Sequence, residues 1–253
     1  MKKIILLILA FGFVIAVFNY RANSDIPGII DKLNAPINKA QSSDLAYKVY
    51  LFNLIPIAEA VVKSPKAETY SGKKALHLAM EAATTQNIAF LFKGNVKLDS
   101  YLDPKTGNPV YFRQELFTSN HGQKIKEVYY DQAAGVMALN GVRRVIFPDT
   151  QDFLSLVYGM GKFDFTKNPR CKFYINTNQK NYVFLGAAAL KPVRKGRKTY
   201  DLLNLQAQIR REDKNNPYHR TNLGVYMFEG VPVYIRVVAS GILITARLYD
   251  IRQ

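Results

Sequence analysis

The residues that most often perform chemistry are few in this chain and lie far apart. Its 253 residues include three histidines, at positions 77, 121 and 219, and one cysteine, Cys171. A zinc site needs His, Cys or carboxylate ligands close in space, and two of them often share one turn of a helix. His77, His121 and His219 have no such spacing, and Gly-rich phosphate-binding loops are absent. The sequence therefore predicts no metal site and no cofactor.

Neighbouring serine and aspartate residues are the next candidates for catalysis. Ser100 follows Asp99, and Ser155 lies close after Asp152, but both pairs are typical of turns and helix caps. No Gly-x-Ser-x-Gly elbow is present. Asp99 and Asp103 are about 13 Å apart if they lie along one strand, which is too far for shared acid–base work. We therefore predict that the protein is not an enzyme and has no catalytic residues. A hydrolase whose site is assembled from residues distant in the sequence is the weaker alternative.

The single cysteine limits how the protein is stabilised. One Cys cannot form an intrachain disulfide, even in an oxidising compartment. Cys171 lies in the strand-like run Arg170–Ile175, with no base nearby, so we predict a small buried apolar residue rather than a nucleophile. Stability must then come from an apolar core, for which the chain is long enough.

The N-terminus reads as a signal for export. Lys2 and Lys3 precede an unbroken apolar run from Ile4 to Phe18, which is the form of a secretory leader. This run is shorter than the roughly 20 residues of a spanning helix. Small residues over 22–24 favour cleavage before Asp25, and an uncleaved anchor in the inner membrane is the alternative. We predict an exported, periplasmic protein. A lipoprotein is excluded, because no cysteine lies near the leader.

Cations are concentrated near residue 195. The segment from 191 to 198 resembles a hairpin loop and is either a solvated turn or an anion contact made by Lys191, Arg194, Lys195, Arg197 and Lys198. Several cations near an anionic membrane contribute about 1 kcal/mol each. The net charge of the whole chain is +16, so an exported protein meets anionic lipid or glycan surfaces first. Export argues against a nucleic-acid partner.

The elements that position these residues are mostly strands. Apolar residues recur at helical spacing within residues 25–43, which predicts a short helical lead-in. From residue 44 the period changes to two, and it is clearest where Leu203, Leu205, Ala207 and Ile209 alternate with polar residues. That alternation indicates one buried face and one solvated face. We predict one β domain over residues 44–253, after a leader over residues 1–24.

Turn residues divide this domain into many short elements. The resulting fold class is mainly β, with a single antiparallel, strongly curved sheet, a barrel or half-barrel, and two or three short helices. Asp149, Thr150 or Asp152 is available as the N-cap of the helix predicted over residues 152–160. Strands are predicted over 45–52, 55–63, 73–83 (where a helix is the alternative), 95–102, 110–118, 124–131, 142–147, 171–177, 182–188, 203–209, 225–228, 231–238 and 242–251, and helices over 87–92 and 152–160.

Several motifs occur in a recognisable order. They are Tyr47-Lys48-Val49-Tyr50, Ile57-Ala58-Glu59-Ala60, Asp99-Ser100-Tyr101-Leu102-Asp103-Pro104, the segment from Asp149 to Tyr158, and Val231-Pro232-Val233-Tyr234-Ile235. In this order the chain resembles, over residues 44–251, the DUF3108 family of exported Gram-negative proteins of unknown function. The resemblance implies an antiparallel, strongly curved β fold in the cell envelope. It implies no activity.

These observations predict a non-enzymatic envelope protein that binds or chaperones a lipid, a lipoprotein or a glycan. A curled sheet either leaves a concave face that holds an acyl chain or fills that space with its own core. The alternative from another class is a structural or assembly module that binds a protein partner through an exposed sheet edge.

Overall fold

The fold is described from a computed structural model, which places residues 26–32, 42–89, 93–178, 180–195, 197–212 and 220–252. The predicted leader, residues 33–41 of the predicted helical lead-in, residues 90–92 of the helix predicted over 87–92 and His219 lie outside these described residues. No helix within them is both long enough and apolar enough to cross a membrane.

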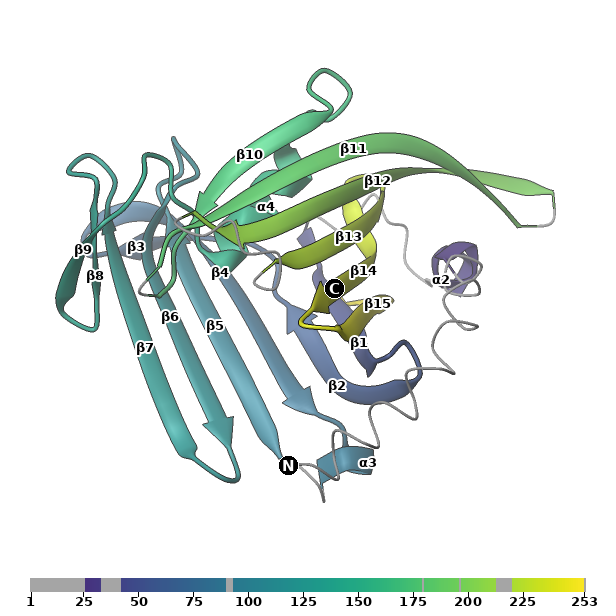
Figure 1. The fold of residues 1–253 in the computed structure, drawn as a ribbon, viewed down its shortest axis with the longest axis horizontal. Coiled ribbons are helices and arrows are strands. Elements are labelled where there is room, and N and C mark those ends of the chain that lie inside the picture. The colour runs from purple at the N-terminus through teal and green to yellow at the C-terminus, as the bar shows by residue number, and fades with distance from the viewer. Residues whose placement is uncertain are drawn as a thin grey trace.

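One antiparallel sheet of fifteen strands contains most of the described chain (Figure 1). Three short helices accompany it in the part of the chain that the structure describes, so the predicted mainly β class with a single antiparallel sheet is confirmed. The helices are α2 (Ile26–Lys32), α3 (Gln86–Ala89) and α4 (Phe153–Lys162), and the strands are β1 (Asp44–Leu51), β2 (Ile55–Val62), β3 (Lys66–Tyr70), β4 (Lys73–Thr84), β5 (Gly94–Leu102), β6 (Pro109–Thr118), β7 (Gly122–Asp131), β8 (Val136–Leu139), β9 (Val142–Val145), β10 (Arg170–Ile175), β11 (Tyr182–Lys195), β12 (Lys198–Arg211), β13 (Thr221–Phe228), β14 (Val231–Ala239) and β15 (Ile242–Arg252).

The sheet is open. Its strand order runs from β10 through β15 to β1, β2 and β4, and ends at β9, with β3 paired to β4 beside this path. No strand pairing among the described residues joins β9 to β10, so a closed barrel is not formed. The C-terminal strand β15 lies between β14 and β1, near the middle of this order. In Figure 1, β10–β13 cross above the steep strands β5–β7.

Tight hairpins account for much of this order. Both residues of the turns Asn140-Gly141, Glu229-Gly230 and Ser240-Gly241 have positive φ. Paired positive φ values are those of the type I′ turn, whose twist matches that of two antiparallel strands. Glycine at the second position adopts such φ values without steric cost. These turns join β8 to β9, β13 to β14 and β14 to β15.

Some predicted elements differ from the observed ones. Residues 73–83 form a strand, not a helix, and β3 and β8 were not predicted. Strand β11 continues to Lys195 instead of ending at residue 188, because its pairing with β12 extends to Lys195 and Lys198. The N-cap of α4 is Asp152, one of the three predicted candidates, and it forms a capping box with Ser155.

Helix α4 packs between the two ends of the sheet. Its Leu156 and Met160 belong to one core cluster with Phe184 of β11 and Leu205 of β12. Its Leu154 belongs to another cluster, which includes Phe112 and Val128 of β6 and β7. The sheet ends are therefore joined through the helix rather than through a ladder of hydrogen bonds.

Helix α2 covers a different part of the sheet. Ile26 and Ile30 pack in a third cluster with Leu202 of β12. Leu202 and Leu205 lie on opposite faces of β12, three residues apart, and both are fully buried. The prediction of one buried and one solvated face is therefore correct for residues 203–209, and Leu202, which precedes them, is buried on the other face.

Candidate functional site

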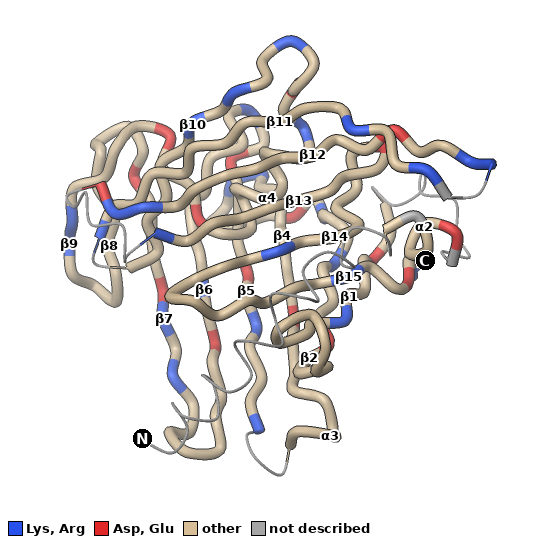
Figure 2. Tube along the Cα trace, turned by 45° about the vertical axis from the view of Figure 1, so that its right-hand side comes forward, with Lys and Arg blue, Asp and Glu red and all other residues tan. Residues whose placement is uncertain are grey.

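The predicted anion contact lies on an arm formed by β11 and β12 (Figure 1). Lys and Arg residues gather toward the end of this arm in Figure 2. The structure brings the predicted cations together. Lys191, Arg194, Lys195 and Lys198 belong to two paired strands, and Arg197 lies in the short turn, since only residues 196 and 197 connect β11 to β12. The exposed members are Lys191, Arg194, Arg197 and Lys198.

Helix α2 holds the arm. The hydroxyl group of Tyr200 donates a hydrogen bond to the carboxylate of Asp31, and Nζ of Lys198 lies 3.6 Å from Oδ1 of the same residue. One of the predicted cations is therefore engaged within the protein. Lys191, Arg194 and Arg197 have no ion-pair partner among the described residues, so their charge can act on an external anion.

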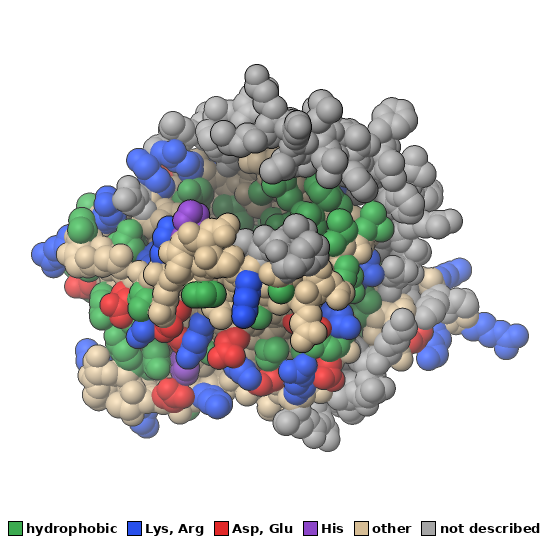
Figure 3. All heavy atoms as spheres, turned by 90° about the horizontal axis from the view of Figure 1, so that it is seen from below, with side chains coloured by type: hydrophobic (Ala, Val, Ile, Leu, Met, Phe, Trp, Pro, Cys, Tyr) green, Lys and Arg blue, Asp and Glu red, His purple; other side chains and the backbone are tan. Residues whose placement is uncertain are grey.

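A second candidate site is the hollow seen from below, which hydrophobic side chains line (Figure 3). One face of β4–β6 carries Met80, Ala82, Val96 and Leu116, all half-buried. Cross-strand register places Ala82, Val96 and Leu116 in one row, and paired residues of antiparallel strands point to the same face. We assign the apolar lining to this face, because the opposite face of the same strands bears Glu81, Lys97 and Glu115.

Strand β7 adds two lysines to this face, the exposed Lys124, which pairs in register with Leu116, and the half-buried Lys126. Lys126 pairs in register with Gln114 of β6, which pairs with the buried Leu98 of β5. Its Nζ lies 6.0 Å from the ring centroid of the fully buried Phe112. Burial lowers the pKa of Lys126, because a low-dielectric environment disfavours the ammonium form. No carboxylate among the described residues forms an ion pair with it, so an anion bound in the hollow would have a cation to contact.

A buried polar cluster lies where α4 meets the sheet. The Ser100 hydroxyl donates a 2.6 Å hydrogen bond to Oδ2 of Asp152. Oδ1 of Asp152 accepts from the backbone N–H groups of Leu154 and Ser155, at 2.7 and 2.9 Å. Ser100 and Asp152 belong to two separate motifs of the sequence, and the fold brings them together. The contact fixes the start of α4 against β5.

The same junction is completed on β10. Gln151 forms an isolated parallel bridge with Ile175, the last residue of β10. The hydroxyl group of Tyr130 of β7 donates a 2.6 Å hydrogen bond to the carbonyl oxygen of Asn176. The rings of Phe147 and Tyr174 stack, with centroids 4.4 Å apart. We call the segment from Phe147 to Lys162 the clasp, because it holds the two ends of the open sheet.

Ser100 and Asp152 have a structural role. Both side chains are fully buried, with no exposed surface, so the serine oxygen cannot reach a substrate. Burial raises the pKa of Asp152 to about 6, although hydrogen bonds from Ser100, Ser155 and Leu154 favour the carboxylate. Ser100 lies within strand β5, in agreement with the strand predicted over residues 95–102.

The raised pKa of Asp152 predicts a pH-dependent stability. The folded state binds the proton more tightly than the unfolded chain, whose pKa is near 3.8. The stability that the folded protein gains from this bound proton is fully present below about pH 4 and is lost as the pH rises through 6. The Asp152→Asn variant cannot ionise and does not lose this contribution. We therefore expect its free energy of unfolding to shift, relative to that of wild type, by up to about 3 kcal/mol in favour of the variant as the pH rises from 4 to 7. Urea unfolding at several pH values measures the difference. Curves of unfolding free energy against pH that are parallel for the two proteins would contradict this prediction. The exposed Asp149→Asn change is the control.

The histidines and the cysteine occupy separate places. The ring nitrogens of His77 lie 3.3 Å from Glu68 and 3.0 Å from Asp99, and the ring stacks on Tyr101. His121 is exposed in the turn between β6 and β7. His77 and Ser100 point to opposite faces, because His77 pairs in register with Tyr101. Within the described ranges, no group of three His, Cys, Asp or Glu residues could hold a metal ion, and for the whole chain this stays a prediction.

Cys171 is buried, as predicted, and burial raises the pKa of its thiol. It faces α4 together with Gly186 of β11. A Cβ atom on Gly186 would lie 2.8 Å from Sγ of Cys171 and 2.9 Å from Cε1 of Phe184. Glycine therefore gives the thiol the space it occupies in the core.

Sequence reasoning did not single out Lys126 or the contact between Ser100 and Asp152. The signal for Lys126 was present, because Lys126, Val128 and Tyr130 share one phase of a predicted strand. A lysine in phase with core residues is unusual and indicates a partly buried cation. The contact between residues 100 and 152 had no local signal, since it depends on the path of the whole sheet.

An open antiparallel sheet with a helix clasped between its ends defines a β-barrel-like protein. The chain belongs to the DUF3108 family, described as a protein of unknown function, whose model matches residues 46–235. The predicted family resemblance is therefore confirmed. No curated protein matches the sequence.

A solved structure supports the same architecture. The fold is similar to the crystal structure of a beta-barrel-like protein of domain of unknown function DUF1849 from Brucella abortus, with a TM-score of 0.59. The match covers 83% of this chain and 96% of that chain, at 8% sequence identity. At this identity the similarity concerns the fold alone.

Proposed function

We propose that the protein is an exported, non-enzymatic envelope protein that binds an anionic amphiphile, a lipid with an acyl chain and a carboxylate or phosphate group. The observation that carries the proposal is Lys126, a half-buried cation on an apolar sheet face with no acidic partner among the described residues. Met80, Ala82, Val96 and Leu116 offer the acyl chain an apolar surface. In this proposal the sheet is a strongly curved half-barrel, whose concave face holds the ligand.

Export and membrane contact complete the proposal. Lys2, Lys3 and the apolar run that follows them support export. The exposed cations of the β11–β12 arm support contact with an anionic membrane, which supplies the lipid. A protein that takes up lipid at such a surface needs both a docking contact and an apolar site. The arm and the hollow are candidates for these two parts.

Oleate is the first probe for the hollow. We expect the Lys126→Met change to weaken oleate binding, measured by isothermal titration calorimetry, by about ten- to a hundredfold, because a charge-assisted hydrogen bond contributes about 1.5–3 kcal/mol. Binding of uncharged 1-monooleoylglycerol should be unchanged. Tighter binding of lysophosphatidylglycerol than of oleate would indicate a phosphate ligand, and the reverse order would indicate a carboxylate ligand.

Two further variants make this experiment decisive. Lys97→Met removes a lysine from the opposite face of the same sheet and should leave binding unchanged. Ala82→Phe fills the hollow and should weaken the charged and uncharged probes alike. Binding of oleate that is insensitive to both Lys126→Met and Ala82→Phe would refute the proposal, as would the absence of binding by all three lipids.

A protein partner at a sheet edge is the second candidate function. β9 is one end of the sheet, and its Val142 and Val145 are 56% and 76% exposed. Edge strands with exposed apolar side chains can pair with a strand of another chain. The strand has four residues, so such a contact would be short.

A further inference from the structure

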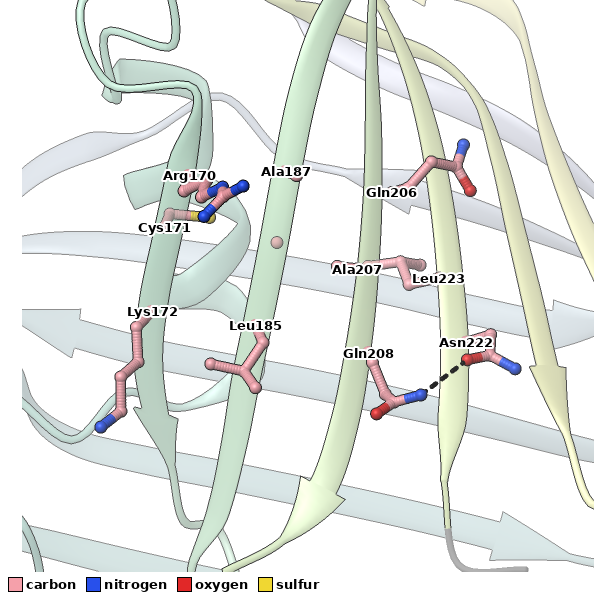
Figure 4. Close-up of a pocket in the computed structure, with 11 residues that line it drawn as sticks. Arg170, Cys171, Lys172, Leu185, Ala187, Gln206, Ala207, Gln208, Asn222 and Leu223 are labelled. Atoms are coloured by element: carbon pink, nitrogen blue, oxygen red, sulfur yellow. Dashed lines mark hydrogen bonds between the residues drawn. The ribbon is translucent and has the colours of Figure 1, made fainter. Parts of the chain in front are cut away.

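A trough crosses strands β10–β13, at a distance from the hollow and the arm tip (Figure 4). Its volume is about 670 Å³, within the usual range for sites that hold small molecules. The polar and charged residues that line it are Arg170, Lys172, Gln206, Gln208 and Asn222. No Asp or Glu is among the lining residues.

Strand register places these five side chains on one face. Arg170 pairs with Ala187, which pairs with Gln206. In the next row, Lys172 pairs with Leu185, which pairs with Gln208, and Gln208 pairs with Asn222. The alternate residues Cys171 and Ala207 point the other way, into the core cluster of α4. The five polar side chains therefore share the face that is turned away from α4.

Small residues keep the trough shallow and bring the amides onto its surface. Gly224 of β13 pairs with Gln206, and a Cβ atom built on Gly224 would lie 3.2 Å from Nε2 of Gln206. The amide of Gln206 therefore lies over the glycine. Its Nε2 donates a 2.6 Å hydrogen bond to Oδ1 of Asn204, and Nε2 of Gln208 donates a 3.3 Å bond to Asn222. These bonds orient the amides and use only part of their donor and acceptor capacity.

The charge of the trough is positive. Arg170 and Lys172 are exposed, and no carboxylate of the described residues forms an ion pair with either. Nζ of Lys172 lies 4.8 Å from the ring centroid of Tyr174. Arg236 of β14, also exposed, continues the row of Gln206 and Gly224. Cations therefore lie at both ends of an amide-lined surface.

We propose that this trough binds an anionic saccharide. Oriented amides donate to and accept from hydroxyl groups, and the cations pair with a carboxylate or phosphate on the sugar. Leu185 and Ala187 lie on the same face, between these polar side chains, and add apolar surface to the trough. The proposal does not depend on lipid binding, because the two sites lie on different strands.

Trigalacturonate, trehalose 6-phosphate and neutral maltotriose are the probes. With the full chain at 150 mM salt, we expect one or both acidic sugars to bind at least tenfold more tightly than maltotriose in isothermal titration calorimetry. The preferred acid identifies a carboxylate or a phosphate ligand. The exposed double change Arg170→Gln/Lys172→Gln should reduce this binding at least tenfold. Gln206→Ala/Gln208→Ala should weaken the sugar but not inorganic phosphate, since it removes only contacts to hydroxyl groups.

Lys73→Gln/Lys74→Gln, which removes two exposed cations from β4, is the matched control and should have no effect. Circular dichroism verifies that every variant is folded. Failure of both acidic sugars to bind at millimolar concentration would overturn the proposal. Equal losses in the trough variant and the control would also overturn it, because they would show attraction by net charge alone.

Discussion

At pH 5, the Asp152→Ala variant is expected to lose at least about 3 kcal/mol of unfolding free energy. The change leaves the Ser100 hydroxyl and the N–H groups of Leu154 and Ser155 without their acceptor in a buried site. Each unsatisfied buried group costs about 1–3 kcal/mol, and loss of the helix cap is one of these terms. At pH 5 the side chain is mostly protonated in the folded state, since its pKa is raised to about 6. The measurement therefore reports lost hydrogen bonds and not the removal of a buried charge.

The matched variant is Asp152→Asn, whose amide oxygen can still cap α4. It should retain most of the stability in urea unfolding at the same pH. An Asp152→Ala protein as stable as wild type would show that the clasp is not held by this cluster. A loss of equal size in Asp152→Asn would contradict the prediction, because it would show that an amide of similar volume cannot replace the carboxyl group as the cap of α4.

Reversing the charge of three arm residues is expected to abolish binding to anionic membranes. Lys191, Arg194 and Arg197 are exposed on the arm, and each cation near such a surface contributes about 1 kcal/mol. Changing all three to Glu should weaken binding to phosphatidylglycerol vesicles at least about a hundredfold. Lys198 is left in place because it pairs with Asp31 of α2. Vesicle co-sedimentation at increasing salt measures both the affinity and its screening.

The control reverses three exposed lysines elsewhere, Lys73, Lys74 and Lys105. It changes the net charge by the same amount and should reduce binding far less. Vesicle binding that ignores salt and the arm reversal would show that the arm is a solvated hairpin. Equal effects of the two reversals would show that only the total charge matters.

The sequence was sufficient for the class of fold where local patterns dominate. Alternation over residues 203–209 predicted part of β12, and the strands predicted over 225–228, 231–238 and 242–251 correspond to β13, β14 and β15. β3 and β8 were missed because they are short, and β3 is mostly exposed, so neither has a clear apolar period. The open sheet could not be distinguished from a barrel, because no local pattern tells whether the first and last strands of the order meet.

The candidate sites were less predictable than the elements. The five cations near residue 195 were found from their spacing, but the place of four of them on two extended strands depends on pairing between β11 and β12. Ser100 and Asp152 are 52 residues apart, and their contact requires β5 and the clasp to be in place. The trough combines residues from four strands. Such sites follow from topology, which single-residue patterns do not contain.

The position of β15 has a consequence for how the protein is made. This strand is synthesised after the other fourteen strands of the sheet, yet it lies between β14 and β1 and pairs with both. Until it emerges, the chain can form two separate sheets, β1–β9 and β10–β14, each with a long unpaired edge. The two halves become continuous only when the C-terminal residues add their hydrogen bonds, and joining residues so distant in sequence is slow. A chain that stops before Ile242 would therefore lack β15 and have two open strand edges at the centre of the sheet, the kind of surface that leads to aggregation.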